Sequence, residues 1–185
     1  SFPTRRSSDL RSLWCINPDK NDNYNFSIIT NQECMDSSYT DLKNYRNMNF
    51  HPLLDWRLGV GLIRVLYDEN YQSGLKHSDY EFPELKNWLV FAKGLAENME
   101  KDFENIEIKT FGELYGFCIS DIYNVIIVHP FWNYTTHQPN EESNLLTSAM
   151  ENAGLENLFF IDTFNLHRRP GWCYGELIKQ IIDVQ

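Results

Sequence analysis

Hydrophobic residues recur at three- and four-residue spacing in two stretches of the chain, which predicts two amphipathic helices. The first stretch opens at His51 and runs to Leu66, and Asp55 is expected in its first turn, where a carboxylate complements the helix dipole. The second runs from Pro83 to Phe103. Pro83 is expected at its start, because a proline costs nothing where the backbone N–H would have no partner.

The period changes at Ile106, where apolar and polar residues begin to alternate as they do along a half-buried strand. Four strands are expected, at residues 106–111, 114–119, 123–128 and 158–161. A helix is expected at 140–154, capped by Asn140 or a neighbour and ended by Gly154, and a last helix at 171–184. The C-terminal part therefore reads strand, helix, strand, helix, an order that favours two adjacent parallel strands joined by a right-handed crossover.

Together these elements predict an α/β fold with a mixed sheet and helices on its faces. Its C-terminal part is expected to be a β-α-β-α unit, with 123–128 and 158–161 as parallel strands. This module is expected to span residues 50–185. Residues 11–49 are polar and Asn-rich, with one strand-like run at 26–29, and are expected to be a connector or the tail of a preceding domain.

The first ten residues, SFPTRRSSDL, resemble the translation of a short-read sequencing adapter, and no initiator Met precedes them. We therefore expect residues 1–10 to be an artefact and the rest to be the C-terminal piece of a longer protein. Arg5 and Arg6 are accordingly not interpreted as a nucleic-acid-binding arm.

The chain is acidic, with a net charge of −10, which argues against a general nucleic-acid-binding surface because phosphate binding depends on Lys and Arg. A local basic patch stays open as a DNA contact. No apolar run approaches the roughly eighteen residues that a membrane span needs, so no membrane partner is expected. The four cysteines lie far apart without metal-ligand spacing. We expect reduced thiols of a cytoplasmic protein and no metal site.

Polar residues follow both predicted parallel strands at their carboxyl ends, where ligands gather in α/β sheets. His129 follows the first strand, and Asp162, Asn165, Arg168 and Arg169 follow the second. Such a polar edge is suited to gripping a phosphate or polarising a carbonyl. Alternatively, His129 and Asp162 bond each other and the arginines neutralise nearby carboxylates.

The arginine pair carries a more specific expectation. One guanidinium is expected to be an internal clamp, with Asp162 as its nearest partner and Asp55 as the next, because a buried unpaired arginine is costly. The other is expected to serve a partner or the nucleic-acid backbone.

Glu107 and Lys109 form an E-x-K sequence on a predicted strand, which resembles the metal-binding strand of restriction-type nucleases. That chemistry needs a second carboxylate from a nearby strand, and the preceding residues are expected to be helical. Alternation on a solvated strand explains the sequence equally well. The chain has no Gly-rich phosphate loop, G-x-S-x-G or H-E-x-x-H sequence.

Three segments carry a family resemblance: HPLLDWRLGVGLIRVL at 51–66, VIIVHPFWN at 125–133 and FFIDTFNLHRRPGWCYGEL at 159–177. Together they resemble the extreme C-terminal region of large bacterial DEAD/DEAH-box helicases of phage-defence and DNA-repair type. The resemblance is concentrated in the last fifty residues. It implies a non-motor accessory module that contacts DNA, the helicase motor domains or a partner subunit.

The motor sequences of such helicases, which bind ATP and Mg²⁺, do not occur in this chain. The resemblance therefore implies that ATP and Mg²⁺ belong to a missing N-terminal portion and that no cofactor is held here. It transfers no catalytic residue. Two other functions stay open: a nuclease or phosphoryl-handling domain that uses the His129/Asp162/Arg168 edge, and a ligand-free protein-interaction domain with exposed aromatic residues.

Overall fold

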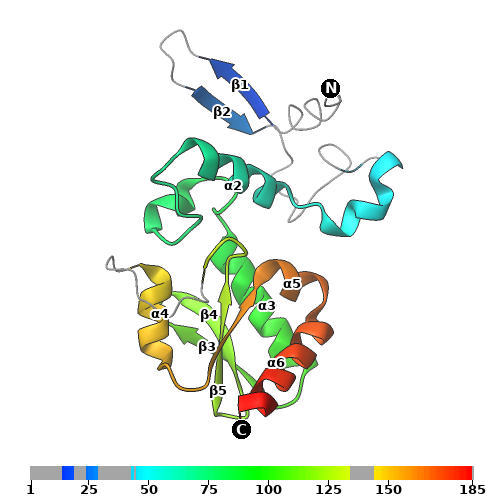
Figure 1. The fold of residues 1–185 in the computed structure, drawn as a ribbon, viewed down its shortest axis with the longest axis vertical. Helices are drawn as coiled ribbons and strands as arrows, with labels where there is room; N and C mark the ends of the chain where they lie inside the picture. Colours follow the sequence, from blue (N-terminus) through cyan, green and yellow to red (C-terminus); the bar gives the residue numbers. More distant parts are fainter. Residues whose placement is uncertain (1–13, 19–23, 29–42, 44, 134–143, 185) are drawn as a thin grey trace. The chain divides into compact units, whose positions relative to one another are not determined.

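The computed structural model describes residues 14–18, 24–28, 43, 45–133 and 144–184. The chain divides into two compact units, Ser1–Asn70 and Tyr71–Gln185 (Figure 1). The adapter-like decapeptide and the first residues of the predicted helix at 140–154 lie outside the described residues. The expected start of the C-terminal module, near residue 50, falls within the first unit.

The first unit contains the antiparallel pair β1 (Trp14–Pro18) and β2 (Tyr24–Ile28), the 3₁₀ helix η1 (Tyr45–Leu53) and the helix α2 (Trp56–Tyr67). Residues 26–28 of the strand-like run predicted at 26–29 lie in β2, and residue 29 lies outside the described residues. Strand β1 was not predicted.

The helix predicted to open at His51 begins five residues later, at Trp56. Asp55 is its N-cap rather than a first-turn residue, and its carboxylate accepts a hydrogen bond from the Arg57 N–H at 3.0 Å. A side-chain acceptor at this position satisfies one of the N–H groups that a helix start leaves open, so the α-helix begins where the cap lies.

The described residues of the second unit form nine elements in chain order. They are η2 (His77–Glu81), α3 (Trp88–Asp102), β3 (Ile106–Phe111), β4 (Leu114–Ile119), β5 (Tyr123–Val128), α4 (Leu145–Ala153), β6 (Leu158–Asp162), α5 (Thr163–Arg168) and α6 (Pro170–Val184).

These strands form one sheet in the order β3-β4-β5-β6. The β3–β4 and β4–β5 pairs are antiparallel, and β5 pairs with β6 in parallel, with Ile126 opposite Phe160. The predicted mixed sheet and its C-terminal β-α-β-α unit are thereby confirmed. The crossover runs through α4, because strands that point the same way cannot be joined by a tight turn.

Helices cover both faces of this sheet, with α4 on one side and α3, α5 and α6 on the other (Figure 1). The side-chain amide of Asn124 on β5 donates to the Ala153 carbonyl at the end of α4, at 2.9 Å. Phe103, which follows α3, stacks on Tyr174 of α6 with ring centroids 4.5 Å apart. Apolar residues buried between these layers form the core; the most enclosed are Leu85, Met99, Leu114, Phe117, Val125, Ile126, Ile127, Leu166 and Leu177.

Helix α3 begins at Trp88 and not at Pro83 as predicted. Residues 83–87 form turns instead, in which the N–H groups of Leu85 and Lys86 both donate to the Phe82 carbonyl. Leu85 is 1% exposed, so burial of this side chain fixes a turn that the helical period alone does not distinguish from a first helical turn.

The ends of α4 follow the predicted chemistry with a shifted start. Asn144 is the N-cap, with its side-chain oxygen accepting the Thr147 N–H at 2.9 Å. Gly154 ends the helix with φ of +76°, a conformation that glycine adopts without a steric penalty. Helix α5 was not predicted, and it changes the geometry of the candidate site.

Candidate functional site

The carboxyl ends of β5 and β6 lie side by side. In their parallel register Val128 is opposite Asp162, so the residues after both strands emerge at one edge of the sheet, as predicted. The two continuations then differ. The chain after β5 turns through His129 to Trp132, whose N–H donates to the His129 carbonyl at 3.0 Å, whereas β6 passes directly into α5.

Asp162, the last residue of β6, is the N-cap of α5. Its Oδ1 accepts the backbone N–H of Asn165 at 2.8 Å, and its Oδ2 accepts the side-chain Nδ2 of the same residue at 2.6 Å. One carboxylate thus caps the helix and also holds the side chain of Asn165, three residues further along the chain.

Asn165 also bonds to Arg169. Its Oδ1 accepts hydrogen bonds from Nε of Arg169, at 3.0 Å, and from Nη2 of the same guanidinium. The Arg169 guanidinium in turn lies over the Trp172 ring, with Cζ 3.9 Å from the ring centroid. Asp162, Asn165, Arg169 and Trp172 therefore form a continuous chain of contacts, which we call the Asp162–Trp172 chain.

Arg168 points to a different partner. Its Nη1 donates to the Phe164 carbonyl at 3.3 Å, and its Cζ lies 3.9 Å from the centroid of the Phe164 ring. Arg169 does not form the expected direct pair with Asp162, because Asn165 lies between the two side chains and bonds to both. The other expected partner, Asp55, belongs to the first unit and pairs with Arg57 at 3.0 Å.

His129 joins an aromatic cluster rather than the Asp162–Trp172 chain. It is 5% exposed, and its Nδ1 accepts the Phe131 N–H at 3.3 Å. Its ring centroid lies 5.8 Å from that of Trp88, 5.2 Å from that of Phe131 and 6.2 Å from that of Trp132. The five predicted residues thus divide into a buried histidine and a polar group that runs from Asp162, at the end of β6, to Arg169, just after α5.

Trp88 connects the two groups. Its ring packs against His129, and its Nε1 donates to Thr163 Oγ1, the first residue of α5, at 3.4 Å. Trp132 extends the cluster in the other direction, since its Nε1 donates to the Ser73 carbonyl at 3.0 Å. Buried indole N–H groups need such partners, so these bonds hold α3, α5 and the loop at Ser73 in fixed positions around the edge.

A buried thiol lies beneath the Asp162–Trp172 chain. The pKa of Cys173 is raised from 9.0 to about 11, mainly by burial and also by the Asp162 carboxylate, while the Arg169 guanidinium acts in the opposite direction. Reactivity requires the thiolate. Cys173 is therefore a packing residue near neutral pH, in agreement with its 0% exposure.

The E-x-K sequence lies on β3, where Glu107 is exposed and pairs across the sheet with Cys118. Within the described residues, no group of three or more His, Cys, Asp or Glu side chains is placed to hold a metal ion. Cys118 itself is buried and free, as is Cys173.

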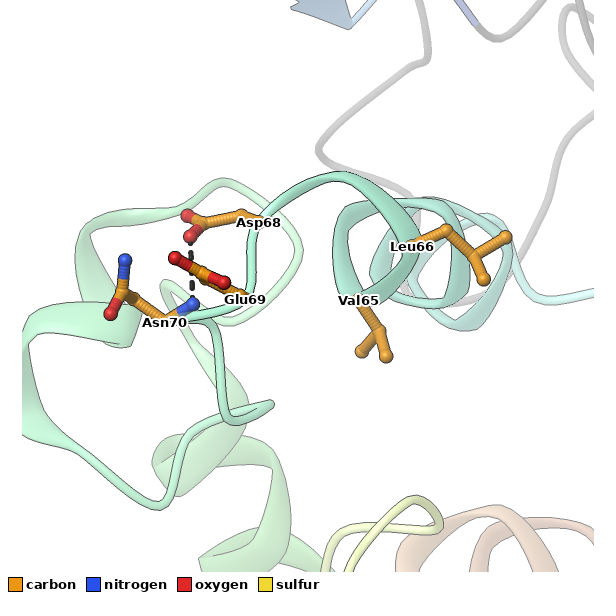
Figure 2. A pocket seen from close by; sticks show the side chains of 5 residues that line it. All are labelled: Val65, Leu66, Asp68, Glu69 and Asn70. Carbon is orange, nitrogen blue, oxygen red and sulfur yellow. Dashed lines mark hydrogen bonds between the residues drawn. The ribbon is translucent and has the colours of Figure 1, made fainter.

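An open hollow of about 490 Å³ lies elsewhere, in the first unit. Figure 2 shows Val65 and Leu66 on α2 beside the side chains of Asp68, Glu69 and Asn70, which follow the helix. The Asp68 carboxylate accepts the Asn70 N–H at 3.0 Å, which holds the turn that lines the hollow. None of the predicted site residues contributes to it.

Trp172 and Phe164 are the site residues that the sequence did not reveal. Trp172 is apolar and lies in the last predicted helix, where a core position would be expected, yet it is 49% exposed, while the buried stripe runs through Cys173, Leu177 and Ile181. The four-residue spacing of that stripe excludes position 172. This spacing is the signal that could have identified Trp172 as a surface residue.

No protein-family model, curated protein or solved structure matches the chain. In the described part of the chain, no helix is both long enough and apolar enough to cross a membrane.

Proposed function

We propose that this chain is a non-motor accessory module of a bacterial DNA helicase and that it contacts DNA through the end of α5 and the start of α6. The functional class rests on the resemblance of its three segments to the C-terminal region of such helicases. The place of contact rests on the arginine–aromatic surface, which we define as Phe164, Arg168, Arg169 and Trp172.

The observation that carries the proposal is the pair of guanidiniums on consecutive residues, each lying 3.9 Å from the centroid of an aromatic ring. A guanidinium stays charged at all physiological pH values, and its planar donors match the oxygens of a phosphate. Arg169 is the more accessible of the two: its guanidinium is exposed and lies over the Trp172 ring, whereas Nη2 of Arg168 is buried. Arg169 and Trp172 are both exposed, so DNA can reach this surface.

The acidic balance of the chain limits the size of the contact. With a net charge of −10, the chain as a whole repels a phosphate backbone. We therefore expect a small contact in which each phosphate-binding arginine accounts for about one unit of the dependence of log K on log salt concentration.

The internal contacts of the predicted edge support binding rather than catalysis. His129 lies in an aromatic cluster, with Nδ1 accepting a backbone N–H, and Asp162 caps a helix. A general base must reach the proton that it removes, and a nucleophile needs a base beside it. The positions of these two side chains favour a structural role for both.

The test is DNA binding measured by fluorescence anisotropy across a series from about 50 to 200 mM salt. Arg168→Ala and Arg169→Ala are compared separately with the parent chain. Lys179→Ala is the matched control, since it removes an exposed cation that pairs with Glu176 on the same helix α6. All proteins carry Arg5→Ala and Arg6→Ala, so that the adapter-like residues contribute nothing.

Arg169→Ala should weaken binding and flatten the salt slope by about one unit, while Lys179→Ala should leave both unchanged. Binding that is unaffected by either arginine variant would remove the DNA role and favour a protein partner. Mg²⁺-dependent cleavage of the DNA, abolished by Asp162→Ala, would favour a phosphoryl-handling enzyme instead.

A further inference from the structure

We infer that Asn165 is a positioning residue, which with Asp162 holds the Arg169 guanidinium over the Trp172 ring and presents its outer edge to a DNA phosphate. The inference deepens the proposed function and rests on it. It assigns roles to two residues that need not touch the DNA themselves.

The orientation of the Asn165 amide follows from the chemistry of its two neighbours. A carboxylate can only accept hydrogen bonds, so the amide nitrogen faces Asp162, where the Nδ2–Oδ2 distance is 2.6 Å. A guanidinium can only donate, so the amide oxygen faces Arg169, where the Nε–Oδ1 distance is 3.0 Å. A flipped amide would oppose donor to donor and acceptor to acceptor. The pair of neighbours thus permits one orientation.

In this orientation one edge of the guanidinium bonds to Asn165, and a second edge keeps N–H donors for a ligand. The Asn165 oxygen accepts from Nε and Nη2, which together form the side edge of the planar group. The end edge, formed by the two terminal nitrogens, has donors left over, because a guanidinium carries five N–H groups. Among the described residues, Arg169 forms no ion pair with a carboxylate.

The arrangement reduces the entropy that Arg169 loses on binding. A long flexible side chain that must be immobilised by its ligand weakens binding, and one that is already held loses less freedom. Here three contacts hold it: two hydrogen bonds to Asn165 and the face of Trp172. Loss of Asn165 should therefore weaken binding while the charge stays in place. Loss of Arg169 should remove the charge as well.

These two effects are separable by salt dependence. In the anisotropy assay above, Asn165→Ala should weaken DNA binding about three- to tenfold with an unchanged salt slope. Arg169→Ala should weaken binding and lower the slope by about one unit. Lys179→Ala again serves as the control, and thermal melting of each variant establishes that it is folded.

A second variant disrupts the Asp162–Asn165 contact from the Asp162 side and keeps the helix cap. Asp162→Asn keeps an N-cap oxygen, because Asn caps helices as well as Asp does, but it places an amide nitrogen against the amide nitrogen of Asn165. It should weaken DNA binding in the same way as Asn165→Ala. If Asn165→Ala fails to fold, this variant decides the matter.

Fluorine NMR of 5-fluorotryptophan-labelled protein gives a readout that does not depend on DNA. The Trp172 signal is identified by its loss in Trp172→Phe, and it should move in both Asn165→Ala and Arg169→Ala because the stacked cation leaves the ring.

The outcomes distinguish this inference from the proposed function. If the parent chain binds DNA through Arg169, but Asn165→Ala changes neither the affinity nor the Trp172 signal, the positioning role is wrong and the proposed function stands. If the parent chain does not bind DNA at all, both are overturned, whatever the NMR signal does.

Discussion

Gly116 and Val125 approach each other so closely across the β4–β5 pair that a Cβ atom on Gly116 would overlap the Val125 carbonyl oxygen. The same Cβ would lie 2.9 Å from Cε2 of Phe111. The carbonyl belongs to the backbone of a central strand, so it cannot move aside without shifting the strand. This contact explains why a glycine occupies the middle of a buried strand, where glycine is otherwise unfavourable.

The first prediction follows from this contact. Gly116→Ala should lower the free energy of unfolding by about 3 kcal/mol or more, because overpacking against backbone forces the strands apart. Gly94→Ala is the matched control: it lies within α3, a Cβ there meets no atom within 4 Å, and it should raise stability by up to about 1 kcal/mol. Urea denaturation measures both. Equal stability of the two variants would contradict the geometry of the β4–β5 pair.

The second prediction concerns Asp79, which is 3% exposed and holds the loop before η2. Its Oδ2 accepts the backbone N–H groups of Gln72 and Gly74, each at 3.0 Å. Asp79→Ala should lower the free energy of unfolding by about 2 to 4 kcal/mol, because it leaves two N–H groups without their acceptor. Asp79→Asn keeps one acceptor oxygen and should cost less. A loss in the Ala variant no larger than that in the Asn variant would show that the loop has other support.

The third prediction concerns Tyr80. Among the described residues, its buried hydroxyl has no hydrogen-bond partner. Burial raises the pKa of this hydroxyl above its usual value of 10.0, and the charges of Asp79 and Glu113 add to the effect. Tyr80→Phe should stabilise the chain by about 1 kcal/mol, because it removes a buried polar group whose desolvation nothing offsets.

The dependence of stability on pH above 10 tests whether the Tyr80 hydroxyl is buried. Above pH 10 the unfolded tyrosine ionises while the folded one does not, so unfolding becomes more favourable as the pH rises. The phenylalanine variant should therefore lose less stability above pH 10 than the parent chain. Thermal melting across this range measures the difference, and parallel curves would contradict burial of the hydroxyl.

The fourth prediction uses the raised pKa of Cys173. Well below pH 9 the thiol is protonated in both the folded and the unfolded states, so it contributes no pH dependence there. Between 9.0 and about 11 the unfolded thiol ionises first, and the free energy of unfolding should fall by up to about 3 kcal/mol as the pH rises. Cys173→Ala should remove this part of the slope.

Thiol labelling tests the same burial at neutral pH. In a background with Cys15→Ser and Cys34→Ser, the folded chain should react with a thiol reagent far more slowly than the denatured chain, because both Cys118 and Cys173 are buried. Rapid labelling of Cys173 in the folded state would contradict its place beneath the Asp162–Trp172 chain.

The sequence alone determined the kinds of elements and the way in which the C-terminal strands pair. The strands at 106–111, 114–119 and 123–128 coincide with β3, β4 and β5, because the alternation at 106–111 and the apolar run at 123–128 are local patterns. The parallel β5–β6 pair was predictable from order alone, since a helix between two strands makes a crossover.

Helix starts were less predictable, because a cap or a turn anchored by one buried side chain decides them. Asp55 and Leu85 are the two cases, and each shifts the start of a helix by five residues from the periodic pattern. Helix α5 spans six residues, which is too short for a hydrophobic period to show.

Only the tertiary structure decided how the polar edge is divided. The sequence placed His129 and Asp162 at the same edge, and the β5–β6 register agrees. Their partners depend on the direction that each chain segment takes after its strand. His129 packs against Trp88, which lies on a helix distant in sequence. Asp162 instead bonds to Asn165, and Asn165 bonds to Arg169. Contacts between residues far apart in the chain have no local sequence signal, so the site's geometry had to come from the fold.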